Sequence, residues 1–160
     1  MSNKPHVLLV EDEAPKSKPI ESLVAGIAPH ARMTLTRSVN SALDVLEAGQ
    51  VDLLLLDMSL PTFDVGEREA GGRPQGFGGT EVLRHMAMAE ISCPTVVITG
   101  YEGFAREGGV IVDLAKLREE LSEEFPNILH AVLHYNSTLD EWKTVLTATI
   151  RDTGISGLAS

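Results

Sequence analysis

Short apolar runs alternate along the chain with segments whose apolar residues recur every three or four positions. The runs predict buried strands, because parallel strands covered on both faces are nearly continuous in Val, Leu and Ile. The predicted strands lie near residues 7–10, 31–35, 51–56, 95–98 and 128–133. The predicted helices lie near residues 20–27, 39–46, 82–87, 114–125 and 139–150. This strict alternation predicts an α/β fold, a doubly wound five-stranded parallel sheet with helices on both faces.

Two prolines, Pro15 and Pro19, lie between the first predicted strand and the helical pattern that follows it. Proline lacks a backbone donor and fits a helix only in its first turn. We therefore expect the first helix to start late or to be distorted at its beginning.

Acidic residues end two of the apolar runs. Glu11 and Asp12 follow the first run and Asp57 follows the third, with no basic residue beside them in sequence. If both runs are parallel strands of one sheet, the three carboxylates share one edge. Like charges at close range resist joint ionisation, so the cluster favours a bound cation, for which Mg²⁺ is the natural candidate. The alternative is that each acid only caps the helix after it.

The composition of the chain limits its size class, its binding partners and its location. The chain has 160 residues, 43% of them hydrophobic, which suits one domain spanning residues 1–160 with no output domain. The formal net charge of -10 argues against direct nucleic-acid binding. A lone cysteine, Cys93, excludes an internal disulfide, and no apolar run is long enough for a signal peptide or a membrane span. We expect a cytoplasmic protein that contacts no membrane.

Three motifs in order carry a family resemblance: LLVEDE with the Glu11–Asp12 pair, LLLLDMSLP with Asp57, and VVITGY with Thr99. Over nearly its whole length the chain resembles the receiver domain of two-component response regulators. The resemblance implies a flavodoxin-like fold with strand order 2-1-3-4-5.

The resemblance also implies roles for individual residues. Asp57 would accept a phosphoryl group from a sensor histidine kinase, a phosphotransfer protein or a small phosphodonor. Asp12, Asp57 and the backbone carbonyl of Ser59 would bind Mg²⁺, and Glu11 would act through a bound water. The hydroxyl of Thr99 would contact a phosphoryl oxygen and move in the switch. A downstream protein, or a second copy of the chain, would dock on the surface of the fourth helix, fifth strand and fifth helix.

The fifth predicted strand departs from the receiver pattern. Receivers end it with Lys-Pro, and the lysine pairs with the phosphoryl group, whereas Tyr135 and Asn136 stand at those positions here, with His134 one residue away in register. None of these supplies a fixed cation. The aromatic residue that takes part in the family's switch is also missing, because Val132 and Leu133 are aliphatic.

Two segments are longer than the family needs. Residues 62–79 form a glycine-rich insertion after Asp57, in which Arg68 or Arg73 could supply the missing cation. The alternative, favoured by the usual behaviour of long loops, is an insertion without contact to the site. Residues 101–112 are expected to be irregular.

Three functions fit these observations. The first is a stand-alone receiver that signals through phosphorylation-dependent protein contacts and is not an enzyme. The second is a pseudo-receiver, a protein-interaction module that needs no phosphorylation. The third is an aspartyl-nucleophile phosphatase, which is the weakest because that family has a second Asp where this chain has Ser59.

Overall fold

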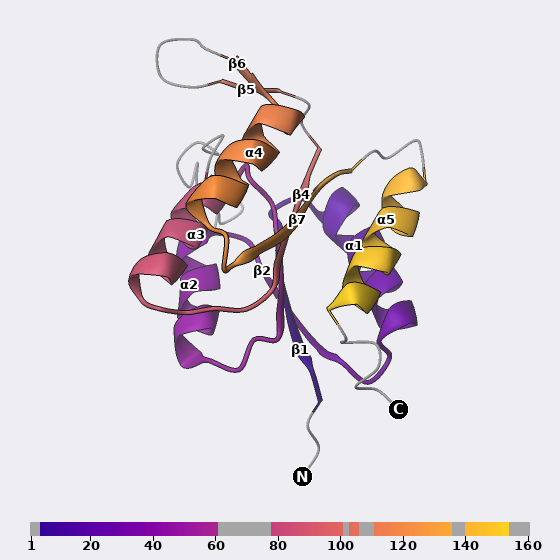
Figure 1. Ribbon diagram of the computed structural model, residues 1–160. Helices are drawn as coiled ribbons and strands as arrows, with labels where there is room; N and C mark the ends of the chain where they lie inside the picture. The colour runs from indigo at the N-terminus through magenta and orange to yellow at the C-terminus, as the bar shows by residue number, and fades with distance from the viewer. Residues whose placement is uncertain (1–3, 61–77, 101–102, 106–110, 136–139, 154–160) are drawn as a thin grey trace, which may run out of the picture.

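The computed structural model describes residues 4–60, 78–100, 103–105, 111–135 and 140–153 (Figure 1). Five parallel strands form the main sheet in the order β2-β1-β3-β4-β7. Their bounds are β1 (His6–Val10), β2 (Arg32–Thr36), β3 (Leu53–Leu56), β4 (Thr95–Thr99) and β7 (Leu129–His134). The predicted α/β, flavodoxin-like fold with strand order 2-1-3-4-5 is confirmed.

Helices cover both faces of the sheet, as Figure 1 shows. One face carries α1 (Ala14–Ile27) and α5 (Glu141–Asp152); the other carries α2 (Val39–Ala48), α3 (Gly78–Met88) and α4 (Leu114–Glu124). Side chains of β3 alternate between the two faces, with Leu54 and Leu56 in one half of the core and Leu53 and Leu55 in the other. Burial of β3 on both sides explains why its sequence is an unbroken leucine run. In the described part of the chain, no helix has the length and apolar character to cross a membrane.

The expected late start of the first helix is wrong. Helix α1 begins at Ala14, with Pro15 in its first turn and Pro19 inside it. Pro19 has no N–H to donate to the carbonyl of Pro15, four residues earlier. That carbonyl instead accepts a hydrogen bond from the hydroxyl of Tyr135 at 3.5 Å. The helix continues past the proline because Ile20 and Val24 are buried against the sheet.

Helix α3 starts slightly before residue 79, the expected end of the glycine-rich insertion. Helix α3 begins at Gly78, so Gly78 and Gly79 belong to the helix rather than to the insertion. A Cβ at Gly78 would lie 2.5 Å from the carbonyl oxygen of Leu60, and one at Gly79 would clash with the carbonyl oxygen of Asp57. The two glycines let the start of α3 approach the backbone that follows β3.

Residues 101–112, expected to be irregular, contain regular structure. Strands β5 (Gly103–Ala105) and β6 (Ile111–Asp113) pair in antiparallel register next to α4. Strands of three residues are too short to show an alternating pattern in sequence. They form a sheet separate from the main one.

Candidate functional site

The strand register brings the two acidic segments together. Strand β1 pairs with β3 so that Val10 is opposite Leu56, and the residues that follow, Glu11 and Asp57, leave the sheet side by side. The N–H of Asp57 donates to the carbonyl of Val10 at 3.1 Å, and the N–H of Glu11 donates to the carbonyl of Thr36 at 3.0 Å. Both acids therefore stand on backbone fixed by the sheet.

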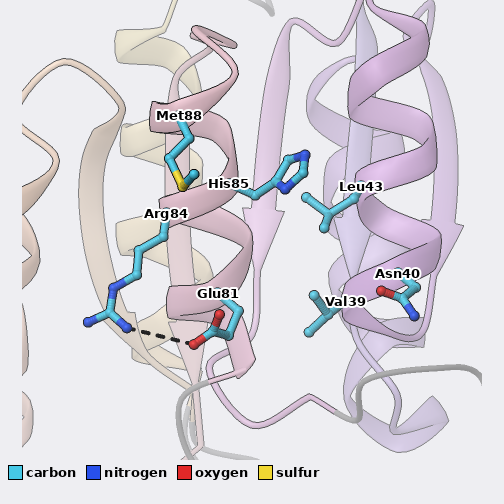
Figure 2. Close-up of a pocket in the computed structure, with 7 residues that line it drawn as sticks. All are labelled: Val39, Asn40, Leu43, Glu81, Arg84, His85 and Met88. Atoms are coloured by element: carbon cyan, nitrogen blue, oxygen red, sulfur yellow. Dashed lines mark ion pairs between the residues drawn. The ribbon is translucent and has the colours of Figure 1, made fainter.

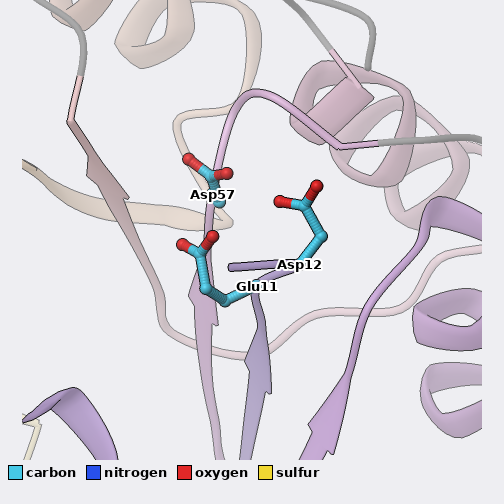
Figure 3. Close-up of side chains that lie close together, drawn as sticks. All are labelled: Glu11, Asp12 and Asp57. Atoms are coloured by element: carbon cyan, nitrogen blue, oxygen red, sulfur yellow. The ribbon is translucent and has the colours of Figure 1, made fainter. Parts of the chain in front are cut away.

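The carboxylates of Glu11, Asp12 and Asp57 lie at one edge of the sheet, as Figure 3 shows. Each offers an oxygen, and these oxygens lie within 4.8 Å of one another. Glu11 and Asp57 are buried, whereas Asp12 is half-buried. The structure thus gathers the three acids that the sequence singles out.

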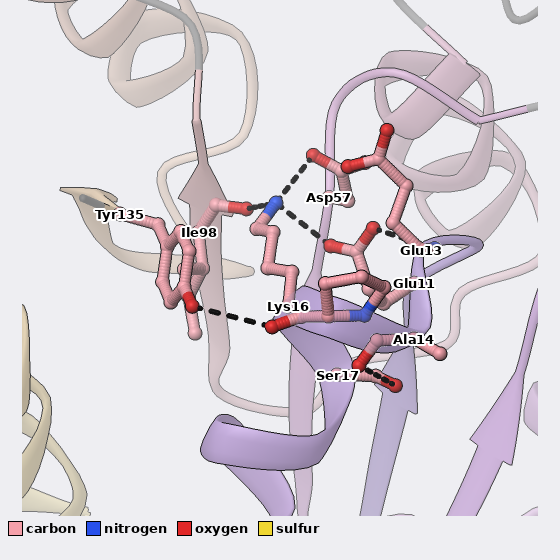
Figure 4. Close-up of polar contacts among 9 residues, drawn as sticks. Glu11, Glu13, Ala14, Lys16, Ser17, Asp57, Ile98 and Tyr135 are labelled. Atoms are coloured by element: carbon pink, nitrogen blue, oxygen red, sulfur yellow. Dashed lines mark hydrogen bonds and ion pairs between the residues drawn. The ribbon is translucent and has the colours of Figure 1, made fainter. Parts of the chain in front are cut away.

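A buried lysine, Lys16 in the first turn of α1, lies among these acids (Figure 4). Its Nζ is 2.7 Å from Oε1 of Glu11 and 3.0 Å from Oδ1 of Asp57. It also donates to the carbonyl oxygen of Ile98, in β4, at 2.8 Å. The three contacts use all three N–H bonds of the ammonium group.

Sequence reasoning missed Lys16, which supplies Glu11 and Asp57 with a fixed cation from α1. The signal was present, because Lys16 precedes Ile20 and Val24 at intervals of four and so lies on the buried face of α1. A lysine on a buried helix face needs an anionic partner. Because the first helix was expected to start near residue 20, Lys16 was not considered part of it.

Burial dominates the ionisation of the two acids that Lys16 contacts. Burial, and then the charge of Asp57, raises the pKa of Glu11 to about 8, although Lys16 acts in the opposite direction. Burial also raises the pKa of Asp57 against the charge of Lys16 and the backbone N–H groups of Ser59 and Met58. The cluster resists complete ionisation in the absence of a further cation.

The other two charged groups follow the same physics. Burial, and then the charge of Asp57, raises the pKa of Asp12. Burial lowers the pKa of Lys16, but the charges of Asp57 and Glu11 outweigh it, so the net shift is upward and the ammonium stays charged. When all three carboxylates are ionised, the single ammonium of Lys16 leaves two negative charges without a partner. An all-oxygen donor set with this charge suits a hard divalent cation such as Mg²⁺.

The remaining predicted site residues lie near this edge or outside the described residues. Thr99 is buried at the end of β4, next to Ile98, whose carbonyl binds Lys16. Ser59 is partly exposed, two residues after Asp57. Arg68 and Arg73, proposed from sequence as sources of a cation, lie outside the described residues.

An aromatic residue occupies the position after β7, the fifth strand of the main sheet, where receivers have their lysine. Tyr135 directly follows β7, and its N–H donates to the carbonyl of Thr99 at 2.8 Å. Its ring centroid lies 5.9 Å from Nζ of Lys16 and 4.9 Å from the ring of Trp142. The half-buried His134 pairs with Thr99 in the sheet register. Tyr135 therefore flanks the ammonium group without adding a charge.

A surface pocket between α2 and α3 is a separate feature (Figure 2). It is lined by Val39, Asn40, Leu43, Glu81, Arg84, His85 and Met88. At its edge Nε2 of His85 lies 2.8 Å from Oε1 of Glu47, and Met88 is 86% exposed. None of the three clustered acids lines this pocket.

The strand order and the acids after β1 and β3 match a known fold. The chain has the fold of a response-regulator receiver domain, as the sequence resemblance implies. A response regulator receiver domain protein from Clostridium thermocellum matches it with a TM-score of 0.63 at 13% identity, covering 96% of this chain and 95% of that chain. The phosphorylated cyanobacterial phytochrome response regulator RcpA matches with a TM-score of 0.61 at 18% identity, covering 91% and 90%.

A third solved structure carries a ligand in the same fold. The response regulator TrrA from Thermotoga maritima, in complex with Mg²⁺ and BeF, matches with a TM-score of 0.58 at 16% identity, covering 91% of this chain and 98% of that chain. At these identities the likeness concerns the fold alone.

In sequence, the chain is similar to response regulatory proteins. It is 25% identical over 142 residues to the Detocs response regulatory protein DtcB of Enterobacter cloacae (strain JD6301), covering 88% of this chain and 94% of that protein. It is 33% identical over 97 residues to the protein of the same name from Vibrio alginolyticus, covering 59% and 65%. No family model matches the chain.

Proposed function

We propose that the protein is a receiver that accepts a phosphoryl group on Asp57 in a Mg²⁺-dependent reaction and signals through contacts with other proteins. The observation that carries this proposal is the convergence of the carboxylates of Glu11, Asp12 and Asp57 at the carboxyl edge of a receiver-type sheet. The similarity to proteins named response regulatory proteins supports it. We expect the phosphoryl source to be a sensor histidine kinase or a phosphotransfer protein, and the reaction to be cytoplasmic.

The transfer is a displacement at phosphorus. An oxygen of the Asp57 carboxylate forms a bond to the phosphorus atom while the bond from phosphorus to the donor breaks, and the leaving group keeps the electron pair. With phosphohistidine the leaving imidazole takes up a proton; with acetyl phosphate, acetate leaves. The product is an acyl phosphate on Asp57, and the protein contributes position and charge rather than a further covalent step.

The acids would hold the cation that this reaction requires. Asp12, Asp57 and the backbone carbonyl of Ser59 would bind Mg²⁺, with Glu11 acting through a bound water. When bound, the ion offsets the repulsion between the anionic phosphoryl group and the anionic acceptor. The buried hydroxyl-bearing Thr99, at the end of the adjacent strand, would donate to a phosphoryl oxygen.

The output surface we propose is formed by α4, β7 and α5. Glu119 and Glu123 are exposed on α4, whereas Arg118 donates to the carbonyl of Val132 at 3.0 Å and so braces α4 against β7. Charge reversal at Glu119 and Glu123 should therefore weaken binding of a downstream protein or a second copy without loosening the fold. An unchanged interaction would exclude this surface.

A pseudo-receiver is the second candidate, and a specific observation favours it. Strand β7 supplies neither the lysine nor the aromatic residue of the usual switch, since Val132 and Leu133 are buried aliphatic residues and Tyr135 follows them. In that case the protein would bind its partner with the same affinity whether or not Asp57 can be phosphorylated.

Intact mass measurement separates the two candidates. The native chain and Asp57→Asn are incubated with Mg²⁺ and acetyl phosphate or phosphoramidate. We expect one phosphoryl adduct on the native chain and none on Asp57→Asn or in the presence of a chelator. A folded native chain that gains no adduct would leave the pseudo-receiver as the function.

A further inference from the structure

Lys16 supplies a cation to the acid cluster from helix α1. Lys16 reaches Asp57 from the first turn of α1, whereas the receiver pattern places its lysine after strand five. The ammonium bridges three elements, because it contacts Glu11 after β1, Asp57 after β3 and the carbonyl of Ile98 in β4. A side chain held by three contacts, with 6% of its surface exposed, has a fixed position.

Tyr135, which directly follows β7, packs beside this lysine. The ring of Tyr135 lies 5.9 Å from Nζ of Lys16, within the range of a cation–π contact. Its hydroxyl donates to the carbonyl of Pro15, which is free to accept because Pro19 lacks an N–H. Trp142 packs against the same ring with centroids 4.9 Å apart. Thus Tyr135 is tied to α1 beside the lysine.

We propose that Lys16 performs from α1 the role that a strand-five lysine has in other receivers, namely holding and orienting the phosphoryl group on Asp57. This inference rests on the proposed function. When the carboxylate becomes an acyl phosphate, Asp57 loses its own charge and gains a phosphoryl group of about two negative charges at neutral pH. Lys16 forms no covalent bond; its contact passes from the Oδ1 atom of the acid to a phosphoryl oxygen.

The same contact acts before the transfer. The transition state spreads negative charge over the phosphoryl oxygens, and a preorganised ammonium inside a water-poor site stabilises it more than water does. The ammonium also lies beside two of the three acids that would hold Mg²⁺, so it repels the metal ion. Lys16 should therefore accelerate phosphorylation while weakening Mg²⁺ binding, and these opposite effects distinguish it from a structural residue.

The test compares Lys16→Met with Lys18→Met, an exposed lysine on the same helix two residues away. Phosphorylation by acetyl phosphate at saturating Mg²⁺ is followed by intact mass, and Mg²⁺ binding by the fluorescence of Trp142, the single tryptophan. We expect Lys16→Met to slow phosphorylation roughly tenfold or more while binding Mg²⁺ at least as tightly as the native chain. Lys18→Met should match the native chain in both measurements.

A second variant places a lysine after β7, where other receivers have theirs. Lys16→Met combined with Tyr135→Lys places an ammonium at the end of β7, next to the vacated position. We expect it to recover a large part of the lost rate, because the chemistry needs the charge at Asp57 and not the element that carries it. A structural role for Lys16 alone predicts no such rescue.

A measurement on the native chain covers the case in which Lys16→Met does not fold. In protein labelled with ¹⁵N-lysine, the ammonium resonance of Lys16 is assigned by its absence in Lys16→Arg. Addition of beryllofluoride, a phosphoryl mimic, to the Mg²⁺-loaded protein should shift this resonance. An unshifted resonance, or a folded Lys16→Met with the native rate, would overturn the inference while leaving phosphorylation of Asp57 intact. A native chain that acquires no phosphoryl group would overturn both.

Discussion

A proton on Glu11 competes with a bound metal ion near neutral pH. Burial and the neighbouring charge of Asp57 raise the pKa of Glu11 to about 8, so below this pH the proton competes with the cation. We expect Mg²⁺ affinity to fall as the pH is lowered, by about 25-fold between roughly pH 8.5 and 6.5 for one competing proton of this pKa. Trp142 fluorescence titrations at several pH values measure it.

The matched variant for this effect is Glu11→Gln, which keeps the shape and removes the titrating group. It should bind Mg²⁺ more weakly at high pH, and its affinity should depend much less on pH. The pKa values of Asp12 and Asp57 are also raised, so a shallow slope should remain at the acid end. An affinity of the native chain that does not change over this range would contradict the protonation of Glu11.

Gly79 determines how closely α3 approaches Asp57. A Cβ at this position would clash with the carbonyl oxygen of Asp57 and lie 2.5 Å from Cε of Met58. Gly79→Ala should therefore lower the free energy of unfolding by about 1–3 kcal/mol, because overpacking outweighs the helix propensity of alanine. It should also slow phosphorylation, since the backbone of Asp57 must shift.

Gly26 is the matched control, because a Cβ there would meet nothing within 4 Å. Gly26→Ala in α1 should raise the free energy of unfolding by roughly 0.5–1 kcal/mol and leave phosphorylation unchanged. Urea denaturation of both variants gives the comparison. Equal stability of the two alanine variants would show that α3 can move away from Asp57 at no cost.

Among the helices and strands, the sequence predicted the alternating strands and helices of the main sheet but missed two short strands and the first turn of α1. The succession of the five main strands and five helices along the chain follows from apolar runs and helical spacing, which burial on both faces of the sheet imposes. The order of the strands within the sheet followed from the family resemblance. The hairpin β5–β6 was missed because its strands have three residues each. The first turn of α1 was missed because Pro19 argues against a helix there, and only packing of the finished helix overrides it.

The two prolines of α1 should respond in opposite directions to the same substitution. Pro19→Ala supplies an N–H for the carbonyl of Pro15 and should raise the free energy of unfolding by about 1–3 kcal/mol. Pro15→Ala, in the first turn where proline fits, should lower it by about 0.5–1 kcal/mol because the unfolded chain becomes more flexible. Urea denaturation of both variants tests this, and a destabilising Pro19→Ala would show that the ring of Pro19 packs favourably.

For the whole molecule, the sequence predicted the fold and the meeting of three acids, but not the charge balance of the site. Convergence of Glu11, Asp12 and Asp57 follows from strand order, since carboxyl ends of parallel strands share an edge. The contact of Lys16 depends on the angle at which α1 leaves the sheet and on its rotation about its own axis. Those are tertiary features that a linear pattern specifies only once the start of the helix is known.

Because the acids gather only in the folded chain, metal binding should be coupled to global stability. At about ten times its dissociation constant, Mg²⁺ should stabilise the native state by about 1.4 kcal/mol, which raises the Tm by roughly 3–6 °C for a chain of this size. Differential scanning calorimetry, with sodium chloride at equal ionic strength as the control, measures this shift.

Asp12→Asn should reverse the order of stability between the two conditions. Lys16 forms ion pairs with Glu11 and Asp57 but not with Asp12, so the negative charge of Asp12 is the least neutralised of the three. Without metal, the variant should be more stable than the native chain, since the repulsion between Asp12 and the other acids is gone. With Mg²⁺ it should gain little, and the native chain should then be the more stable of the two. A native chain whose Tm ignores Mg²⁺ would mean that Lys16 alone balances the acids.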